Sequence, residues 1–222
     1  MRKVVFAFIL TLTVFLSNAQ TNFLIKFGPQ ISMTDVVSSG NYDIKPQGFG
    51  MRYFGGLGLD FHIKKNVAFT LGANYSLKRL GLNDGSNSSI YNLHYIQVPL
   101  GFKFITDEIT RDINLYFVGG FNIEVKVGEN RLEGSEMALI SSAFANNSKE
   151  TSIAFPFQVG FYLGAGAEWL VTPNNQLFAG LNYQRGFVNV INPFLKDNGS
   201  NLIDKLNVQT GIIQLEVGIK FL

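Results

Sequence analysis

The chain has 222 residues, and its 18 lysines and arginines against 16 aspartates and glutamates give a formal net charge of +2. The basic residues form no stripe or patch, which argues against a nucleic-acid partner, and the absence of cysteine excludes disulfides, thiol nucleophiles and thiolate metal sites. The charged fraction is only 15%, and 21 phenylalanines with 23 glycines favour a membrane β-barrel over a secreted β-sandwich, the competing class.

The N-terminus has the pattern of a secretory signal peptide over residues 1–19. A basic start at Arg2 and Lys3 is followed by an almost wholly apolar run and by small residues before an expected cut at Gln20. The apolar run is shorter than the ~20 residues that a spanning helix needs. Cleavage would leave residues 20–222 as the barrel domain, with 18 − 2 = 16 basic and 16 acidic residues and a net charge of zero.

Apolar and polar residues alternate along the rest of the chain. Because successive side chains of a strand point to opposite faces, each alternating segment predicts a strand with one apolar and one polar face. Each segment is about as long as the ~9–11 residues that a tilted strand needs to cross the hydrocarbon. The pattern predicts an all-β fold, an eight-stranded antiparallel transmembrane β-barrel with up-and-down topology. The predicted strands are 23–33, 51–63, 67–78, 96–104, 115–125, 157–169, 177–184 and 212–222.

The connections between these segments are sorted by length. Outer-membrane barrels have short periplasmic turns and longer external loops, whereas a soluble sandwich has no reason to sort its loops. We therefore expect strict alternation of short and long connections, location in the cell outer membrane and both termini in the periplasm. The short connections are 64–66, 106–112 and 172–175, and the long ones are 34–48, 82–91, 127–151 and 188–207.

The polar faces should line the lumen, and they carry charges of both signs. Two interpretations remain open: a salt-bridged plug that fills the lumen, which the near balance of charge favours, or a path for ions or protons. We expect Glu216 and Glu168 to face Lys103 or Lys26. The predicted lumen charges are Lys26, Arg52, Asp60, Lys78, Lys103, Glu124, Glu168, Glu216 and Lys220.

The apolar faces should contact outer-membrane lipid, with aromatic girdles at both interfaces. We expect Phe61, Phe104, Trp169 and Phe221 near the periplasmic ends of the strands. Phe221 is also the predicted outward-facing aromatic that the barrel-assembly machinery reads, although Leu222 follows it.

The segment HYIQVPLGFKF (94–104) carries a family resemblance. It resembles the PorT-like, OmpA-like outer-membrane β-barrels of Bacteroidetes-type bacteria, and Gln97 stands where that pattern usually has Glu. The resemblance implies an OmpA-like eight-stranded barrel, in a group that ranges from gliding and protein-secretion components to barrels of no known role. The matching residues are Tyr95, Ile96, Val98, Pro99, Leu100, Lys103 and Phe104.

Residues that could support catalysis or metal binding are few. His62 follows Asp60 on the polar face, and His94 follows Ser88 and Ser89, but no His-x-Ser pairing occurs. Two distant histidines without cysteine do not complete a tetrahedral metal site. We therefore predict no catalytic, metal or cofactor-binding residues. The predicted function is a non-enzymatic structural or interaction role, with a small transport or ligand-binding barrel and a membrane-embedded lipid hydrolase as alternatives.

The longest connection contains an apolar set that could dock another envelope protein. Residues 131–146 could form a short helix, a cap over the barrel mouth, or a loop that packs on itself. A second apolar loop, 187–195, could join the same surface. The predicted docking residues are Leu132, Met137, Leu139, Ile140 and Phe144.

Overall fold

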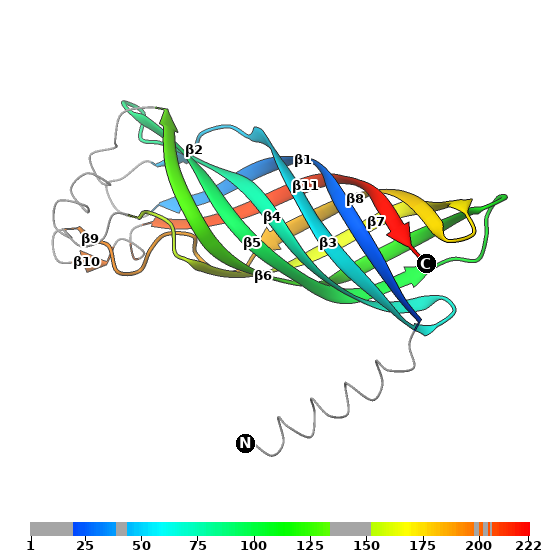
Figure 1. The fold of residues 1–222 in the computed structure, drawn as a ribbon. Helices are drawn as coiled ribbons and strands as arrows, with labels where there is room; N and C mark the ends of the chain where they lie inside the picture. The colour runs from blue at the N-terminus through cyan, green and yellow to red at the C-terminus, as the bar shows by residue number, and fades with distance from the viewer. Residues whose placement is uncertain (1–19, 39–43, 134–151, 198–199, 202–203, 205) are drawn as a thin grey trace, which may run out of the picture.

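The computed structural model describes residues 20–38, 44–133, 152–197, 200–201, 204 and 206–222. Short strands β2 (Lys45–Pro46), β9 (Lys196–Asp197) and β10 (Ser200–Asn201) lie in the connections. Each long strand is antiparallel to the next and β1 pairs with β11, so the sheet closes into an elongated barrel (Figure 1), confirming the predicted eight-stranded fold. The long strands are β1 (Gln20–Ser38), β3 (Gly50–Lys64), β4 (Val67–Asn83), β5 (Ser88–Ile105), β6 (Ile113–Glu133), β7 (Phe157–Thr172), β8 (Asn175–Gly186) and β11 (Leu206–Phe221).

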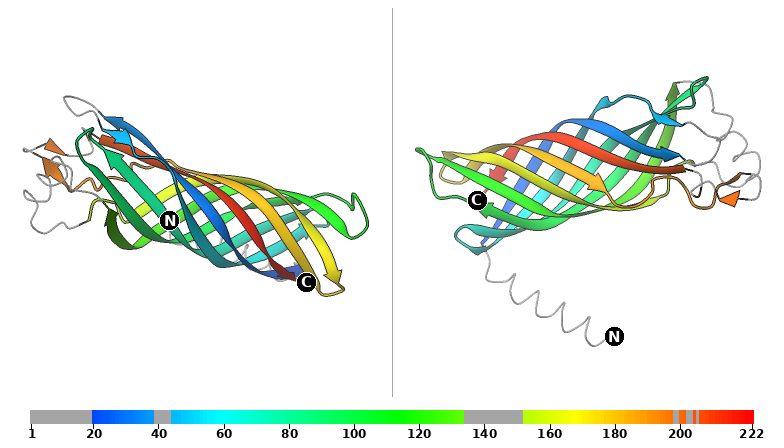
Figure 2. Two further views of the ribbon diagram at one scale, coloured as in Figure 1. Left: turned by 90° about the horizontal axis from the view of Figure 1, so that it is seen from above. Right: turned by 180° about the vertical axis from the view of Figure 1, so that it is seen from behind.

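The strands are staggered, and their pairing register measures the stagger. Starting from Phe61 on β3 and following paired residues once around the barrel leads back to Met51 on the same strand, a shift of 61 − 51 = 10 residues. Such a stagger requires strands inclined by about 40° to the barrel axis. Both views of Figure 2 show strands that run obliquely to the long axis of the barrel.

The two faces of the wall differ as the alternation predicts. The outer face is apolar in its middle, where Phe27 is 61% and Leu181 56% exposed, while the inward Gln97 and Lys103 are 0% and 4% exposed. Aromatic side chains pair on the outer face near the start of β1 and the end of β11, where the rings of Phe23 and Phe221 stack with centroids 6.0 Å apart. Trp169, which is 52% exposed, lies near the same end.

Two ends of the barrel can be named by their connections. The turn end carries residues 65–66, 106–112 and 173–174, together with the C-terminus and the start of β1 (Figure 1). The loop end carries the other four connections and lies at the opposite end of the cylinder. The two ends therefore expose different parts of the chain.

The predicted strict alternation of short and long connections is wrong at one place. Most of the predicted loop 82–91 is strand, because β4 and β5 run on as a hairpin to a tight turn over 84–87. Asp84 Oδ1 accepts hydrogen bonds from the backbone N–H groups of Ser86 at 3.0 Å and Asn87 at 2.6 Å, and Gly85 supplies a φ of 87°. This loop-end turn is shorter than the turn-end connection 106–112.

At the loop end the inward face changes from polar to apolar. Beyond Lys78, the inward residues of β4 are Leu80 and Leu82, and their partners on β5 are Tyr91 and the buried Ser89. Segments from three connections fold into the mouth and complete a buried cluster, which we call the cap core. Its members are Ile44, Leu80, Leu82, Tyr91, Leu93, Tyr95, Ile153, Ala154, Val190, Ile191, Leu195, Leu206 and Val208.

Strand β3 separates from β4 as it approaches the loop end. Pairing between them ends at Ser76 of β4, and side chains of β1 then satisfy the β4 backbone. Gln30 Nε2 donates to Leu77 O at 2.5 Å, and Ser32 Oγ accepts from the backbone N–H of Arg79 at 3.1 Å. Strand β2 then pairs with the last residues of β4.

The predicted signal peptide, residues 1–19, lies outside the described residues. So do four of the predicted docking residues, Met137, Leu139, Ile140 and Phe144. Within the described ranges, no helix is long and apolar enough to cross a membrane.

Candidate functional site

The lumen contains an ion cluster close to the turn end. Lys103 Nζ lies 3.0 Å from Asp60 Oδ2 and also donates to Glu168, whose other oxygen accepts from Lys220. These four side chains are between 1% and 5% exposed. The Lys103 ammonium also lies 4.4 Å from the centroid of the Tyr116 ring. Because buried charges are tolerated only when paired, two cations facing two anions form a self-neutralised filling.

A second ion pair lies next to this cluster. Lys26 Nζ is 3.5 Å from Glu216 Oε2, and the hydroxyl of Tyr116 donates to Glu216 Oε1 at 3.1 Å. Since Tyr116 also contacts Lys103, it connects the two groups of charges across the lumen.

The third ionic contact lies toward the loop end. Lys78 donates to Glu124 Oε2, and both side chains are nearly buried. Glu124 Oε1 accepts from Gln97 Nε2 at 3.0 Å and from Asn122 Nδ2 at 2.8 Å. A glutamate at position 97, as in the PorT-like pattern, would place a second carboxylate against Glu124, so the amide suits this lumen.

Arg52 is the exception among the predicted lumen charges. It lies at the loop end, where β3 has left β4, and it is only half-buried. Its Nε donates to Asn92 Oδ1 at 2.7 Å, and its Nη1 donates to Met51 O at 2.7 Å. Asn92 lies between the inward Tyr91 and Leu93, so the alternation of β5 places it on the outer face. The structure therefore does not bring Arg52 to the lumen carboxylates.

Amide side chains fill the lumen between the ionic groups. Gln184 Nε2 donates to Gln214 Oε1 at 2.7 Å, and Asn122 Nδ2 donates to Gln184 Oε1 at 3.1 Å. Two internal cavities among the described residues measure about 40 Å³ beside Lys26 and Glu216, and about 10 Å³ beside Lys78 and Glu124. The interior of an eight-stranded barrel is only wide enough for its own side chains, and here they occupy it.

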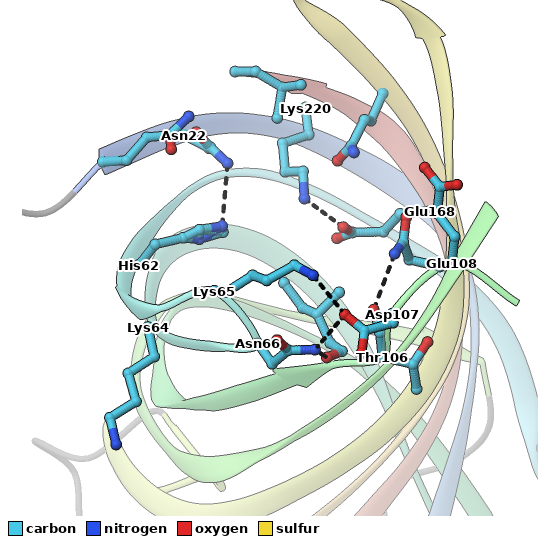
Figure 3. A pocket seen from close by; sticks show the side chains of 15 residues that line it. Asn22, His62, Lys64, Lys65, Asn66, Thr106, Asp107, Glu108, Glu168 and Lys220 are labelled. Atoms are coloured by element: carbon cyan, nitrogen blue, oxygen red, sulfur yellow. Dashed lines mark hydrogen bonds and ion pairs between the residues drawn. The ribbon is translucent and has the colours of Figure 1, made fainter. Parts of the chain in front are cut away.

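A much larger cavity of about 810 Å³ opens at the turn end, and we call it the vestibule. Figure 3 shows its polar lining, with the Lys220–Glu168 ion pair on one side and Asn22 facing His62 on another. Asn22 Nδ2 lies 3.4 Å from His62 Nε2. Three buried polar atoms at its wall, Asn22 Oδ1, His62 Nδ1 and Gln176 Oε1, have no hydrogen-bond partner among the described residues.

An exposed ion pair lies at the rim of the vestibule (Figure 3). Lys65 Nζ donates to Asp107 Oδ1 at 2.9 Å, and Asn66 Nδ2 lies 3.4 Å from the same oxygen. The hydrogen bond from Lys65 lowers the pKa of Asp107 and raises the pKa of Lys65. The pair joins the connection after β3 to the connection after β5.

The opposite end of the lumen is closed by a clamp on β6 that the sequence reasoning missed. Glu129 accepts from the backbone N–H groups of Ile153 at 2.9 Å and Ala154 at 3.2 Å, and from Ser152 Oγ at 2.8 Å. Lys126 Nζ lies 2.6 Å from Glu129 Oε2 and also donates to Ala154 O. This clamp holds the segment before β7 inside the mouth.

The connection between β8 and β11 is fastened to the same segment. Asn189 Oδ1 accepts from the backbone N–H groups of Ile191 at 3.0 Å and Val208 at 2.9 Å. The Val190 N–H donates to Val208 O at 2.7 Å, and the Phe155 N–H donates to Val190 O at 2.6 Å. Two separate connections therefore form one hydrogen-bonded cap over the apolar core.

The proposed docking surface is divided by this arrangement. Leu132 is 51% exposed on β6, and Phe187 and Phe194 are 53% and 63% exposed. Val190 and Ile191, which the sequence placed in the same apolar loop, are instead buried in the cap core. The apolar character of residues 187–195 therefore serves the interior as well as the surface.

The residues considered for hydrolase chemistry lie apart. Ser89 is inward and buried, whereas His94 faces outward. The two residues are five positions apart on β5, and side chains at an odd spacing along a strand point to opposite faces. Ser88 shares the outer face of His94 but lies six residues away, about 20 Å along the strand. His94 Nδ1 lies 2.5 Å from the Tyr75 hydroxyl. Among the described residues, no group of three or more His, Cys, Asp or Glu residues could hold a metal ion.

Comparison with solved structures places this fold among outer-membrane barrels. The outer membrane protein OprG from Pseudomonas aeruginosa is similar, with a TM-score of 0.55 and 14% identity over 91% of this chain and 97% of that chain. Neisserial surface protein A has a TM-score of 0.47 and 16% identity, over 90% of this chain and 96% of that chain. The outer membrane protease OmpT from Escherichia coli has a TM-score of 0.49 and 10% identity, also over 90% of this chain and 96% of that chain. At 14% identity, the likeness to OprG shows the fold alone.

A search of curated proteins finds no match. A family model described as the outer membrane protein beta-barrel domain matches residues 18–192, which is 192 − 18 + 1 = 175 of the 222 residues. With its closed barrel and apolar outer face, the chain therefore belongs to the outer membrane protein beta-barrel domain family and is an outer-membrane β-barrel protein.

Proposed function

We propose that this protein is a non-enzymatic barrel with a sealed lumen. Its role is structural, or it binds other envelope proteins. The closed lumen carries the proposal. Ion pairs and amides leave internal cavities of only about 40 and about 10 Å³, and the cap core closes the loop end. A filled barrel offers its rims and loops, rather than its interior, for function.

The resemblance to PorT-like barrels makes an accessory role in a secretion or gliding machinery the preferred form of this proposal. Several matching residues line the lumen, since Tyr95 is 0% and Lys103 4% exposed. The pattern around residues 94–104 therefore specifies lumen packing, and members of one subfamily would share the plug.

We further propose that the turn end lies in the periplasm. The start of β1 and the C-terminus both lie at the turn end, opposite the cap (Figure 1). Short turns in the periplasm and larger connections outside are the usual arrangement in outer-membrane barrels.

Conductance in planar lipid bilayers tests the sealed lumen. We expect no stable single-channel steps, because no hydrated ion fits between the Lys103 cluster and the cap core. Protease protection and heat-dependent gel mobility on the same sample would establish insertion. Stable unitary currents from inserted protein would contradict the proposal and would favour the alternative, a small transport or ligand-binding barrel, for which the vestibule of about 810 Å³ is the supporting feature.

A further inference from the structure

Two half-buried arginines, Arg52 of β3 and Arg79 of β4, lie outside the lumen where the apolar band ends, close to the cap. Arg52 is flanked along β3 by Met51 and Tyr53, which are 59% and 62% exposed. Arg79 lies on the outward side of β4, beyond Tyr75, which is 44% exposed. Tyrosine is enriched where membrane meets water, so we expect both guanidinium groups at the level of lipid headgroups.

The two side chains share neighbours on β3 and β5. Arg52 donates to Asn92 Oδ1 at 2.7 Å, and Asn92 is the cross-strand partner of Arg79. Arg79 Nη1 donates to Gln47 O, and its chain lies over Gly50, where a Cβ would come within 2.2 Å of Arg79 Cδ. Gly50 is therefore required for this course of the Arg79 side chain.

A third arginine provides an internal contrast. Arg185 lies on β8, on another side of the barrel, and its Nη2 is 2.9 Å from Asp35 Oδ2. The partners of Arg52 within the described residues are the uncharged oxygens of Asn92 and Met51. Arg185 is therefore neutralised by a carboxylate, whereas Arg52 keeps its positive charge next to exposed apolar side chains.

We infer that Arg52 and Arg79 bind the phosphate group of an anionic lipid in the leaflet at the loop end. Guanidinium groups suit phosphate because they donate parallel hydrogen bonds in a fixed planar geometry. The exposed Met51, Tyr53 and Tyr75 beside them would be covered by the acyl chains of the same lipid. This inference depends on the membrane location of the barrel and not on the sealed lumen.

Lipid binding by the full mature chain in neutral detergent micelles tests the inference, with phosphatidylglycerol as the probe and native mass spectrometry as the readout. Each arginine near a charged membrane surface contributes roughly fivefold to the affinity, so Arg52→Gln with Arg79→Gln should weaken binding roughly 30-fold. Arg52→Gln alone, which leaves the Arg79–Gln47 contact intact, should weaken it roughly fivefold.

Arg185→Gln is the matched control, and it should leave phosphatidylglycerol binding unchanged. Equal losses from Arg185→Gln and Arg52→Gln, or no loss from either Arg52 variant, would overturn the inference. Titration with inorganic phosphate separates a lipid site from a free-phosphate site. Saturable phosphate binding that depends on Arg52 would replace the lipid assignment, whereas its absence supports the lipid.

Discussion

The middle of the barrel and its loop end are built from the same strands, but the polarity of the inward and outward faces is reversed between them. In the middle, Leu181 points outward and Lys103 inward. At the loop end, Arg79 and Asn92 lie on the outer face while Leu93 is buried inside. Strand alternation alone does not decide which face of the barrel wall is apolar. The surroundings decide it: acyl chains surround the middle of the barrel, and water surrounds the part that projects beyond the membrane.

The two regions are therefore expected to resist unfolding for different reasons. The middle has a polar core in which each buried charge is compensated by a partner, so its stability is sensitive to charge balance. The cap has an ordinary apolar core, so its stability is sensitive to volume. Substitutions that disturb one property at a time can separate the two regions.

The largest effect is expected from Lys103→Met. Removing this cation leaves Asp60 and Glu168 facing each other in the lumen with only Lys220 nearby. Breaking a buried ion pair in this way costs about 3–5 kcal/mol. Urea unfolding in lipid vesicles, followed by the fluorescence of the single tryptophan, Trp169, measures the loss.

A second substitution checks the cause. Lys103→Met combined with Asp60→Asn removes one charge of each sign and should recover a substantial part of the lost free energy of unfolding. If the double variant is as unstable as Lys103→Met, charge balance does not govern the middle of the barrel.

An intermediate and local effect is expected from Leu93→Ala in the cap core, where Leu93 is 0% exposed. A buried Leu→Ala substitution costs about 3 kcal/mol, which corresponds to roughly 100-fold faster hydrogen exchange of the amides that the cap protects. The Val190 N–H, bonded to Val208 O at 2.7 Å, is the amide to follow.

Leu181→Ala on the lipid-facing wall is the control for size and should leave exchange in the cap unchanged. The comparison between regions fails if Leu93→Ala shifts the unfolding detected at Trp169 as strongly as it speeds exchange at Val190. In that case the cap and the barrel would unfold as one unit.

The smallest effect is expected at the rim of the vestibule, from Asp107→Asn. The hydrogen bond from Lys65 lowers the pKa of Asp107 below the ordinary 3.8. Its contribution to stability is therefore complete above about pH 4 and is lost as the pH falls through the lowered pKa. Because both side chains are largely exposed, wild type and variant should differ slightly at pH 7 and converge in acid. A difference that grows below pH 4 would contradict this sign.

Much of the barrel could be predicted from the sequence because period-2 alternation is strong where one face meets lipid. The predicted strand 67–78 shows what limited the prediction of strand ends. Leu80 and Leu82 continue the inward phase of Lys78, but apolar residues on a predicted polar face resemble the end of a strand. The same change of polarity made residues 82–91 resemble a loop.

The details of the site depend on contacts between residues distant in the chain. Lys103 and Glu168 are 65 residues apart, and no local pattern selects them as partners. Arg52 follows the inward phase of β3, yet it leaves the lumen because β3 separates from β4. Glu129 could have been noticed as an acid three residues after Lys126, but its role depends on backbone N–H groups of a later segment.

The ten-residue stagger limits how the length of this chain can vary during evolution. Inserting one residue in the middle of a strand would invert every following side chain and turn lysines such as Lys103 toward acyl chains, unless a bulge absorbed the slip. Because the strands form a ring, the pairing register with both neighbouring strands would also be disturbed. Insertions and deletions should therefore accumulate in the connections and at strand ends, while the spacing within each membrane-level strand stays fixed.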